Sequence, residues 1–125
     1  AFASFSNFGY PVSERAEKMH NAPAILDARG ADFEYDGEMT ADVALNPEVM
    51  ARYPFCRLSG PANILVMPAR HSASISVKMM QELAGATVIG PILSGVEKPI
   101  QLCSTNSTSN DILNMAVVAA AKVGE

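Results

Sequence analysis

The residues with the clearest chemical potential form a polar run before the last predicted helix. This run supplies hydroxyl and amide side chains from Ser104, Thr105, Asn106, Ser107, Thr108 and Ser109, and it leads to Asp111. Free backbone N–H groups at a helix N-terminus favour anions, so the run could hold a phosphate. Taken alone, these residues are more typical of a flexible polar loop. In this alternative Thr108 or Ser109 caps the helix, and Asp111 interacts favourably with the helix dipole in the first turn.

Two histidines and a glycine segment also invite a chemical interpretation. His71 beside Arg70 could bind a phosphate, but this pair is more typical of an ordinary helix start. His20 falls within a predicted helix and is expected to face solvent without a partner. Segment 90–95 could let a backbone approach a ligand or could simply turn, and it lacks the spacing of a dinucleotide or P-loop motif.

Three alternating carboxylates, Asp32, Glu34 and Asp36, would share one face of a predicted strand. They could bind a metal, but a solvated strand face is the favoured interpretation. The sequence contains no Ser-His-Asp order, no His-Glu-x-x-His and no Cys-x-x-Cys. No convincing catalytic set emerges from the residues themselves.

Composition excludes several classes of protein. The chain has 125 residues, 49% of them hydrophobic and 18% charged, with a net charge of −4, as expected of one globular domain. The basic residues form no stripe, so no nucleic-acid partner is expected. No apolar run of the required length and no secretory signal occur, so we expect no membrane and a cytoplasmic location with both cysteines reduced. Since Ala1 falls in a predicted strand, we expect an excised domain or fragment.

The order of predicted elements indicates an α/β fold, with a mostly parallel sheet flanked by helices. Strands are expected at 2–5, 32–36, 62–67, 86–89 and 100–103, and helices at 13–29, 40–44, 46–52, 71–84 and 109–122. The last helix should carry an apolar stripe as far as Val123. Ligands of parallel sheets bind beyond the carboxyl ends of the strands, which here places segments 68–72, 90–98 and 104–111 at the candidate site.

Several motifs occur in order along nearly the whole chain. They are residues 6–9, 36–39 with 42–46, 60–68, 85–93, 98–99 and 111–114. Together they resemble the C-terminal part of the phosphate acetyl/butyryltransferase family. Segments 53–55, 57–61 and 71–76 are similar to the version fused behind bacterial NADP-dependent malic enzymes.

The resemblance implies one lobe of an isocitrate/isopropylmalate dehydrogenase-like (phosphotransacetylase) fold, in which two α/β lobes flank a cleft. Residues 1–97 would form the second lobe, which also carries much of the dimer contact. Residues 98–125 would supply a strand and a helix that return to the first lobe, which this sequence does not include.

The resemblance also assigns site positions. Active transacetylases of the family carry a Ser-Arg pair before the last helix and an Asp at its start. Here Ser104 and Asp111 match, but Thr105 replaces the arginine. A neutral hydroxyl cannot replace a bidentate cation for phosphate, so we expect no catalytic residue in this chain. Ser104, Thr105 and Asp111 are instead expected to bind acetyl-CoA as an effector.

The function implied is that of a regulatory, oligomerising domain of a malic enzyme. The parent would convert malate to pyruvate and CO2 with NADP and Mg or Mn, using N-terminal domains of the same chain. The present chain is expected to hold no cofactor or metal, to catalyse nothing alone and to form a homo-oligomer. Two alternatives stay open, a fragment of an active phosphate acyltransferase and a purely structural dimerisation module.

Overall fold

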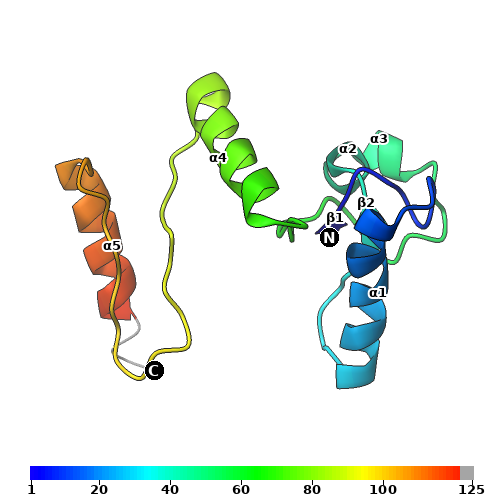
Figure 1. Cartoon of the computed structure of the whole chain (residues 1–125), viewed down its shortest axis with the longest axis horizontal. Helices are drawn as coiled ribbons and strands as arrows, with labels where there is room; N and C mark the ends of the chain where they lie inside the picture. The colour runs from blue at the N-terminus through cyan, green and yellow to red at the C-terminus, as the bar shows by residue number, and fades with distance from the viewer. Residues whose placement is uncertain (122–125) are drawn as a thin grey trace. The chain divides into compact units, whose positions relative to one another are not determined.

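A computed structural model describes residues 1–121 of the chain, which divides into two compact units (Figure 1). Unit 1 comprises residues 1–76, and unit 2 begins at Val77. Lys122 and Val123, both expected in the last helix, lie outside the described residues.

Unit 1 is built on a small parallel sheet. Strands β1 (Phe2–Ala3) and β2 (Gly37–Met39) pair in parallel, with Phe2 opposite Gly37. On the other side of β1, Phe2 forms a parallel bridge with Val66, and Ala3 N donates to Val66 O at 2.8 Å. Parallel segments linked through a helix confirm the predicted α/β class.

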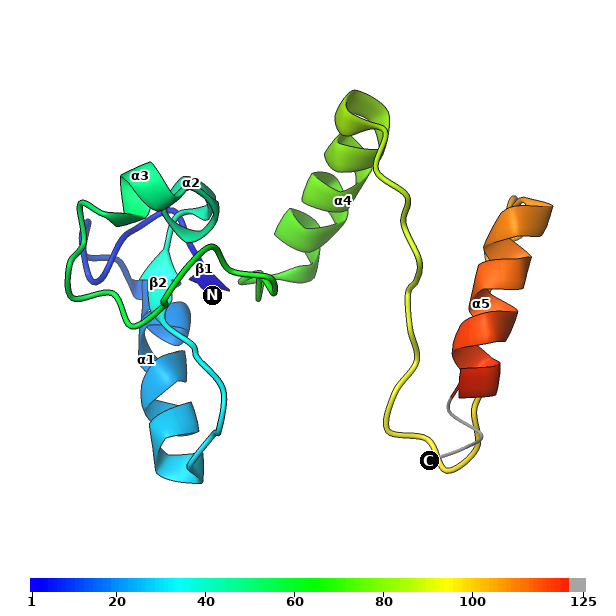
Figure 2. The same ribbon diagram turned by 180° about the vertical axis from the view of Figure 1, so that it is seen from behind.

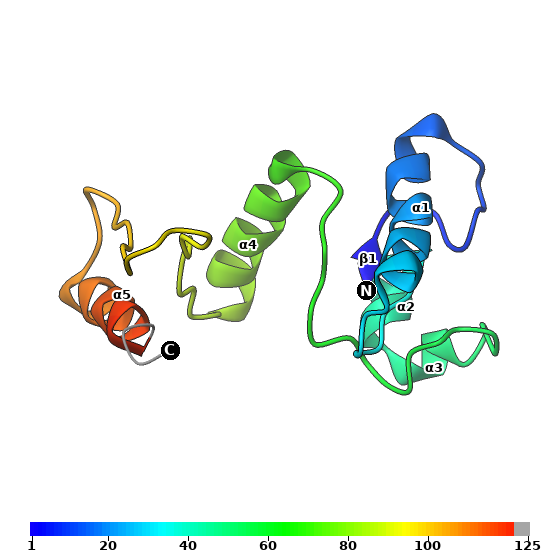
Figure 3. The same ribbon diagram turned by 90° about the horizontal axis from the view of Figure 1, so that it is seen from below.

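Helix α1 (Glu14–Arg29) connects the two strands and packs against both, and Figure 3 shows it beside β1. Ser13 caps its start, because the Ser13 side chain accepts from Arg15 N at 3.3 Å. Gly30 ends it in the left-handed conformation at φ 64°, which a residue without Cβ adopts at low cost. Both boundaries confirm the sequence prediction.

Gly37 allows the close approach of the two strands. A Cβ atom at this position would lie 2.8 Å from both Cβ and O of Phe2, and Gly37 has φ +145°. Any larger residue would therefore push β2 away from β1 or strain the backbone.

The core of unit 1 lies beneath two short helices, α2 (Ala41–Leu45) and α3 (Pro47–Met50). Met39, Val43 and Ala44 form its fully buried centre. Asn46 caps α3, because its side chain accepts from Glu48 N at 2.9 Å. These helices confirm the predictions for 40–44 and 46–52, although α3 is shorter than expected.

A buried carboxylate links three segments of unit 1. Glu38 is 0% exposed, and its side chain accepts from Ser6 Oγ at 2.7 Å and from Gly9 N at 3.0 Å. His20 Nδ1 lies 2.8 Å from the other carboxylate oxygen. A carboxylate only accepts hydrogen bonds, so this nitrogen carries the proton. His20 is exposed, as predicted, but the expectation that it lacks a partner was wrong, because a contact from α1 to β2 is not visible in local sequence.

Residues 32–36 do not form the predicted strand: Asp36 O accepts from Phe2 N at 3.0 Å, but the acidic side chains of the segment bind Arg57 and Ser59. Glu34 Oε2 accepts from Ser59 N at 2.9 Å and from Ser59 Oγ at 2.8 Å. Asp36 accepts from the backbone N of Gly37 and Arg57 at 2.9 and 2.7 Å. Asp36 is 6% exposed, so the expected solvated face is also wrong at this position.

Three further predicted strands are absent from the described part of the chain. Within 62–67 only Val66 forms a bridge, and 86–89 and 100–103 are extended without ladder partners. In unit 2 the side chain of Gln101 bonds the backbone of Leu93, with N to Oε1 at 3.0 Å. Figure 2 shows this connection between α4 and α5 without helix or arrow. An apolar run marks a face to be buried, but it does not supply the neighbouring strand.

The two longer helices after residue 69 expose apolar side chains. Helix α4 (Arg70–Ala84) contains no buried residue, so its predicted Ala73, Val77, Met80 and Ala84 stripe is not a core face here. Helix α5 (Ser109–Ala121) buries only Met115, which is 6% exposed. None of the helices among residues 1–121 has the length and apolar character needed to cross a bilayer.

The buried carboxylate generates a stability prediction. Burial alone would raise the pKa of Glu38, but the hydrogen bonds from Ser6, Gly9 and His20 outweigh it and lower the pKa. Glu38→Ala should reduce the free energy of unfolding of unit 1 by about 3 kcal/mol, because it leaves a cavity and unpaired donors. Urea unfolding followed by tyrosine fluorescence reports this, since Tyr10, Tyr35 and Tyr53 all lie in unit 1.

The pH dependence of unfolding provides a second readout. A carboxyl group whose pKa is lowered by folding stabilises the folded state at pH values above its unfolded pKa, near 4.3. This stabilisation is lost as the pH falls through the lowered pKa of the folded state. Glu38→Gln should remove this pH-dependent contribution to the free energy of unfolding. Glu82→Ala, at an exposed position of α4, is the control and should change the free energy of unfolding by less than about 0.5 kcal/mol. Equal effects of the two alanine variants would contradict the role of Glu38.

Candidate functional site

Ser104 and Asp111, the two sequence-predicted site residues that match the family positions, line one cavity in unit 2. This α5 cavity has a volume of about 280 Å³. Its walls come from Lys78 and Gln81 of α4, residues 88–91, Leu102, Cys103, Ser104, Asn106 and Ser107 of the loop, and Asp111, Asn114 and Met115 of α5. Thr105 is not among the lining residues, so the structure brings two of the three predicted positions together.

Thr108 and Asp111 form a reciprocal cap at the start of α5. Asp111 Oδ2 accepts from Thr108 N and from Thr108 Oγ1, both at 2.8 Å, and Asp111 N donates to Thr108 Oγ1 at 3.2 Å. The hydrogen bonds from Thr108 lower the pKa of the Asp111 carboxyl. Of the two N-cap candidates, the structure selects Thr108. Asp111 is therefore ionised at neutral pH, with one oxygen committed to the cap.

The preceding loop closes on itself through short hydrogen bonds. The Ser104 hydroxyl donates to the side-chain oxygen of Asn106, and Ser107 N donates to Ser104 O at 3.1 Å. With its oxygen accepting from Ser104, the Asn106 side chain, which lines the cavity, keeps its amide N–H groups available as donors. The loop thus offers hydrogen-bond donors to an anionic or carbonyl-bearing ligand.

One basic side chain faces this cavity, and sequence analysis missed it. Lys78 is the single cationic residue among those that line the α5 cavity, and Asp111 is the single acidic one. Lys78 Nζ donates to Gln81 Oε1 at 3.0 Å, one turn along α4. The i, i+3 spacing of Lys78 and Gln81 was visible in the sequence, but their proximity to the 104–111 loop was not.

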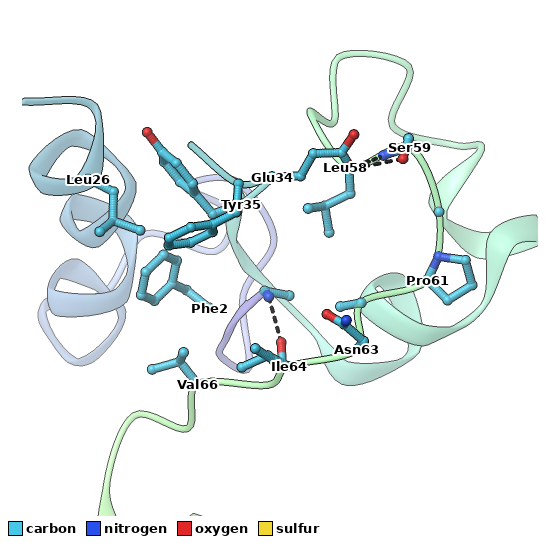
Figure 4. A pocket seen from close by; sticks show the side chains of 14 residues that line it. Phe2, Leu26, Glu34, Tyr35, Leu58, Ser59, Pro61, Asn63, Ile64 and Val66 are labelled. Carbon is cyan, nitrogen blue, oxygen red and sulfur yellow. Dashed lines mark hydrogen bonds between the residues drawn. The ribbon is translucent and has the colours of Figure 1, made fainter. Parts of the chain in front are cut away.

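A larger hollow in unit 1 contains none of the predicted site residues. It has a volume of about 760 Å³ and an apolar wall that includes Phe2, Leu26, Leu58 and Ile64 (Figure 4). Several polar groups at its edge are already paired, since Ala1 N donates to Ile64 O at 2.7 Å and Glu34 accepts from Ser59. This hollow can bury apolar surface, but it presents no activated nucleophile.

A charged cluster forms around Tyr35, which also lines this hollow. Asp27 Oδ1 accepts from Tyr35 Oη at 2.7 Å and from Arg57 Nη1 at 2.8 Å. The Arg57 guanidinium lies 5.0 Å from the Tyr35 ring centroid. The hydrogen bonds from Tyr35 and then Arg57 lower the pKa of Asp27. These contacts tie α1 to residues 35–57 and are structural.

The remaining candidates do not form a site. Arg70 and His71 lie on the first turn of α4, outside both cavities. Within residues 1–121, no group of three or more His, Cys, Asp or Glu side chains is placed to hold a metal ion. Cys56 and Cys103 are free thiols, and burial raises the pKa of Cys56.

Sequence comparisons match almost the whole chain. A family model described as phosphate acetyl/butaryl transferase matches residues 1–120. The chain is 58% identical to an NADP-dependent malic enzyme of Rhizobium meliloti, over 99% of this chain and 16% of that enzyme. It is also 37% identical to a phosphate acetyltransferase of Clostridium acetobutylicum, over 94% of this chain and 36% of that enzyme.

A solved structure supports the same fold. The EutD phosphotransacetylase from Staphylococcus aureus aligns with a TM-score of 0.85 and 28% sequence identity, over 97% of this chain and 38% of that one. The predicted phosphotransacetylase-like α/β fold is therefore confirmed. The chain spans about a sixth of the malic enzyme and well under half of the phosphate acetyltransferase and phosphotransacetylase to which it is compared.

The reciprocal cap at α5 predicts a change in titration. Thr108→Ala removes the hydroxyl of the cap and should raise the pKa of Asp111 toward the usual value of about 3.9. Thr108→Ser keeps the hydroxyl and should leave that pKa low. Carboxyl carbon chemical shifts recorded against pH by NMR measure both variants, and an unchanged Asp111 pKa in Thr108→Ala would exclude the cap as the cause.

Proposed function

Because the chain belongs to the phosphate acetyl/butaryl transferase family, we propose that it serves as the regulatory and oligomerising part of a malic enzyme and senses acetyl-CoA. The identity of 58% to an NADP-dependent malic enzyme, against 37% to a phosphate acetyltransferase, supports a malic-enzyme parent. The residues that line the α5 cavity support acetyl-CoA as the proposed ligand. The single observation that carries the proposal is that Ser104 and Asp111 line one cavity whereas Thr105 does not.

The α5 cavity suits ligand binding better than acyl transfer. Transfer from an acyl phosphate needs a cation that stabilises charge on the transferring group, and family transacetylases use an arginine where this chain has Thr105. Threonine contributes a neutral hydroxyl without the paired donors of a guanidinium. The Ser104 oxygen, whose proton is given to Asn106, and the ionised Asp111 both act as acceptors, so they can orient the thioester end of acetyl-CoA through the amide N–H nearest to it.

The oxidative chemistry of the proposed parent takes place outside these residues. Malate, NADP and Mg or Mn would be bound by N-terminal malic-enzyme domains of the same chain, in the cytoplasm. The described residues do not fit that metal, because they bring no suitable ligand group together. Inhibition of the parent by acetyl-CoA requires that the effector bind one global state better than the other.

The oligomerising part of the proposal comes from exposed apolar side chains. On α4, Met80 and Leu83 are 58% and 80% exposed, and on α5, Leu113 and Val117 are 61% and 59% exposed. Apolar surface of this kind usually marks a contact with another chain or domain. We propose that further lobes of the parent or a second copy of the chain cover these helices.

Two other functions are compatible with the family. A fragment of an active phosphate acyltransferase would show acetyl transfer once the rest of its fold is present. A purely structural dimerisation module would bind no acetyl-CoA. Measurements of acetyl-CoA binding and of acetyl transfer on the full-length protein separate all three.

The effector proposal is tested by loss of inhibition. Ser104→Ala and Asp111→Asn in the full-length protein should each raise the acetyl-CoA concentration for half-inhibition of malate oxidation, on the order of tenfold, because each removes a polar contact to the ligand. Each inhibition curve is normalised to the uninhibited rate of the same variant. Asp32→Asn, an exposed position in unit 1, is the matched control and should leave the curve unchanged. Unchanged inhibition in both site variants, with the fold intact, would move the effector elsewhere.

The residue at position 105 generates a separate prediction about catalysis. The full-length protein should show no acetyl phosphate:CoA acetyltransferase activity in a coupled acetyl-CoA assay, since Thr105 supplies no cation. Thr105→Arg in the isolated chain should not restore activity, because the opposite wall of the expected cleft belongs to the other lobe. Robust turnover by the unaltered protein would instead favour an active acyltransferase.

A further inference from the structure

We propose that Lys78 holds the anionic group of the ligand in the α5 cavity. The identification of that ligand as acetyl-CoA rests on the proposed function, but the anion-binding role rests on the cavity itself. Lys78 is the only cation among the lining residues. None of the ion pairs within the described residues includes Lys78. Within the described part of the chain, its side chain makes one hydrogen bond, from Lys78 Nζ to the neutral Gln81 Oε1 at 3.0 Å.

The negative charge in the same cavity is held back from Lys78. Asp111 commits Oδ2 to the backbone and hydroxyl of Thr108 at 2.8 Å. That arrangement keeps the carboxylate at the helix start, where the N-terminal dipole also stabilises it. Among the described residues Lys78 thus has no counter-ion in an ion pair, and it lines the same cavity as the Asn106 amide and the Ser107 hydroxyl. A cation and neutral donors together select an anion.

The remaining wall limits the kind of molecule that carries this anion. Val88, Ile89, Leu102 and Met115 add apolar surface to the cavity. A volume of about 280 Å³ is near the lower end for small-molecule sites, so the cavity takes one portion of a larger ligand. The chemistry fits a phosphorylated organic molecule that places its phosphate against Lys78 and a short apolar segment against these side chains.

The test compares binding of two probes to the full-length protein and its variants. Isothermal titration with acetyl-CoA measures the whole ligand, and titration with inorganic pyrophosphate measures the anion site alone. Lys78→Gln should weaken binding of both probes on the order of tenfold, through loss of a charge-assisted contact. Lys78→Arg keeps the charge and should stay within about threefold of the unaltered protein. Lys18→Gln, on exposed α1, is the matched control and should bind both probes normally.

The outcomes separate this inference from the proposed function. If Ser104→Ala weakens acetyl-CoA binding while Lys78→Gln changes neither probe, the role of Lys78 is overturned and the effector site stands. If the unaltered protein binds pyrophosphate through Lys78 but does not bind acetyl-CoA, the anion site stands and the proposed effector is wrong. Equal losses in Lys78→Gln and Lys18→Gln would overturn the inference, because they would indicate a general effect of charge.

Discussion

The buried carboxylate of Glu38 holds unit 1 together, because it is the point at which three parts of the chain meet. Ser6 and Gly9 reach it from the turn after β1, and His20 reaches it from α1. Glu38 itself lies in β2, directly after the glycine that allows β2 to approach Phe2. A fully buried charge is tolerated only when its hydrogen bonds are satisfied, so these contacts fix the positions of strand, turn and helix together.

Local chemistry was sufficient to predict the helices, but it could not predict which extended segments pair. Ser13, Gly30 and Asn46 act through backbone groups within a few residues, so their roles are readable from sequence. The alternation at 32–36 is equally compatible with a ladder and with side chains that bond elsewhere, and the partners Ser59 and Arg57 are distant in the sequence. For the same reason His20 could not be assigned its contact with Glu38.

The candidate site shows the same division between local and distant information. Thr108 was one of two expected N-caps, and the structure confirms it, whereas the reciprocal bond from Asp111, three residues away, was not expected. The placement of Ser104 and Asp111 in one cavity followed from a family motif, not from any physical pattern in the loop. Lys78 was missed because an isolated lysine on a helix is usually a solvated residue, and only the folded chain shows that it lines the same cavity.

The proposed ligand site and the proposed partner surface of unit 2 involve the same two helices. The α5 cavity is lined from α4 and α5, and each of these helices also exposes apolar side chains such as Leu83 and Val117. Within the described part of unit 2, Met115 is the one buried side chain, so few internal contacts hold the two helices in place. If the proposed partner covers the apolar faces in the arrangement that the proposed ligand stabilises, ligand and partner favour each other to the same extent. A regulatory role needs this reciprocity, and it requires no catalytic residue in the chain.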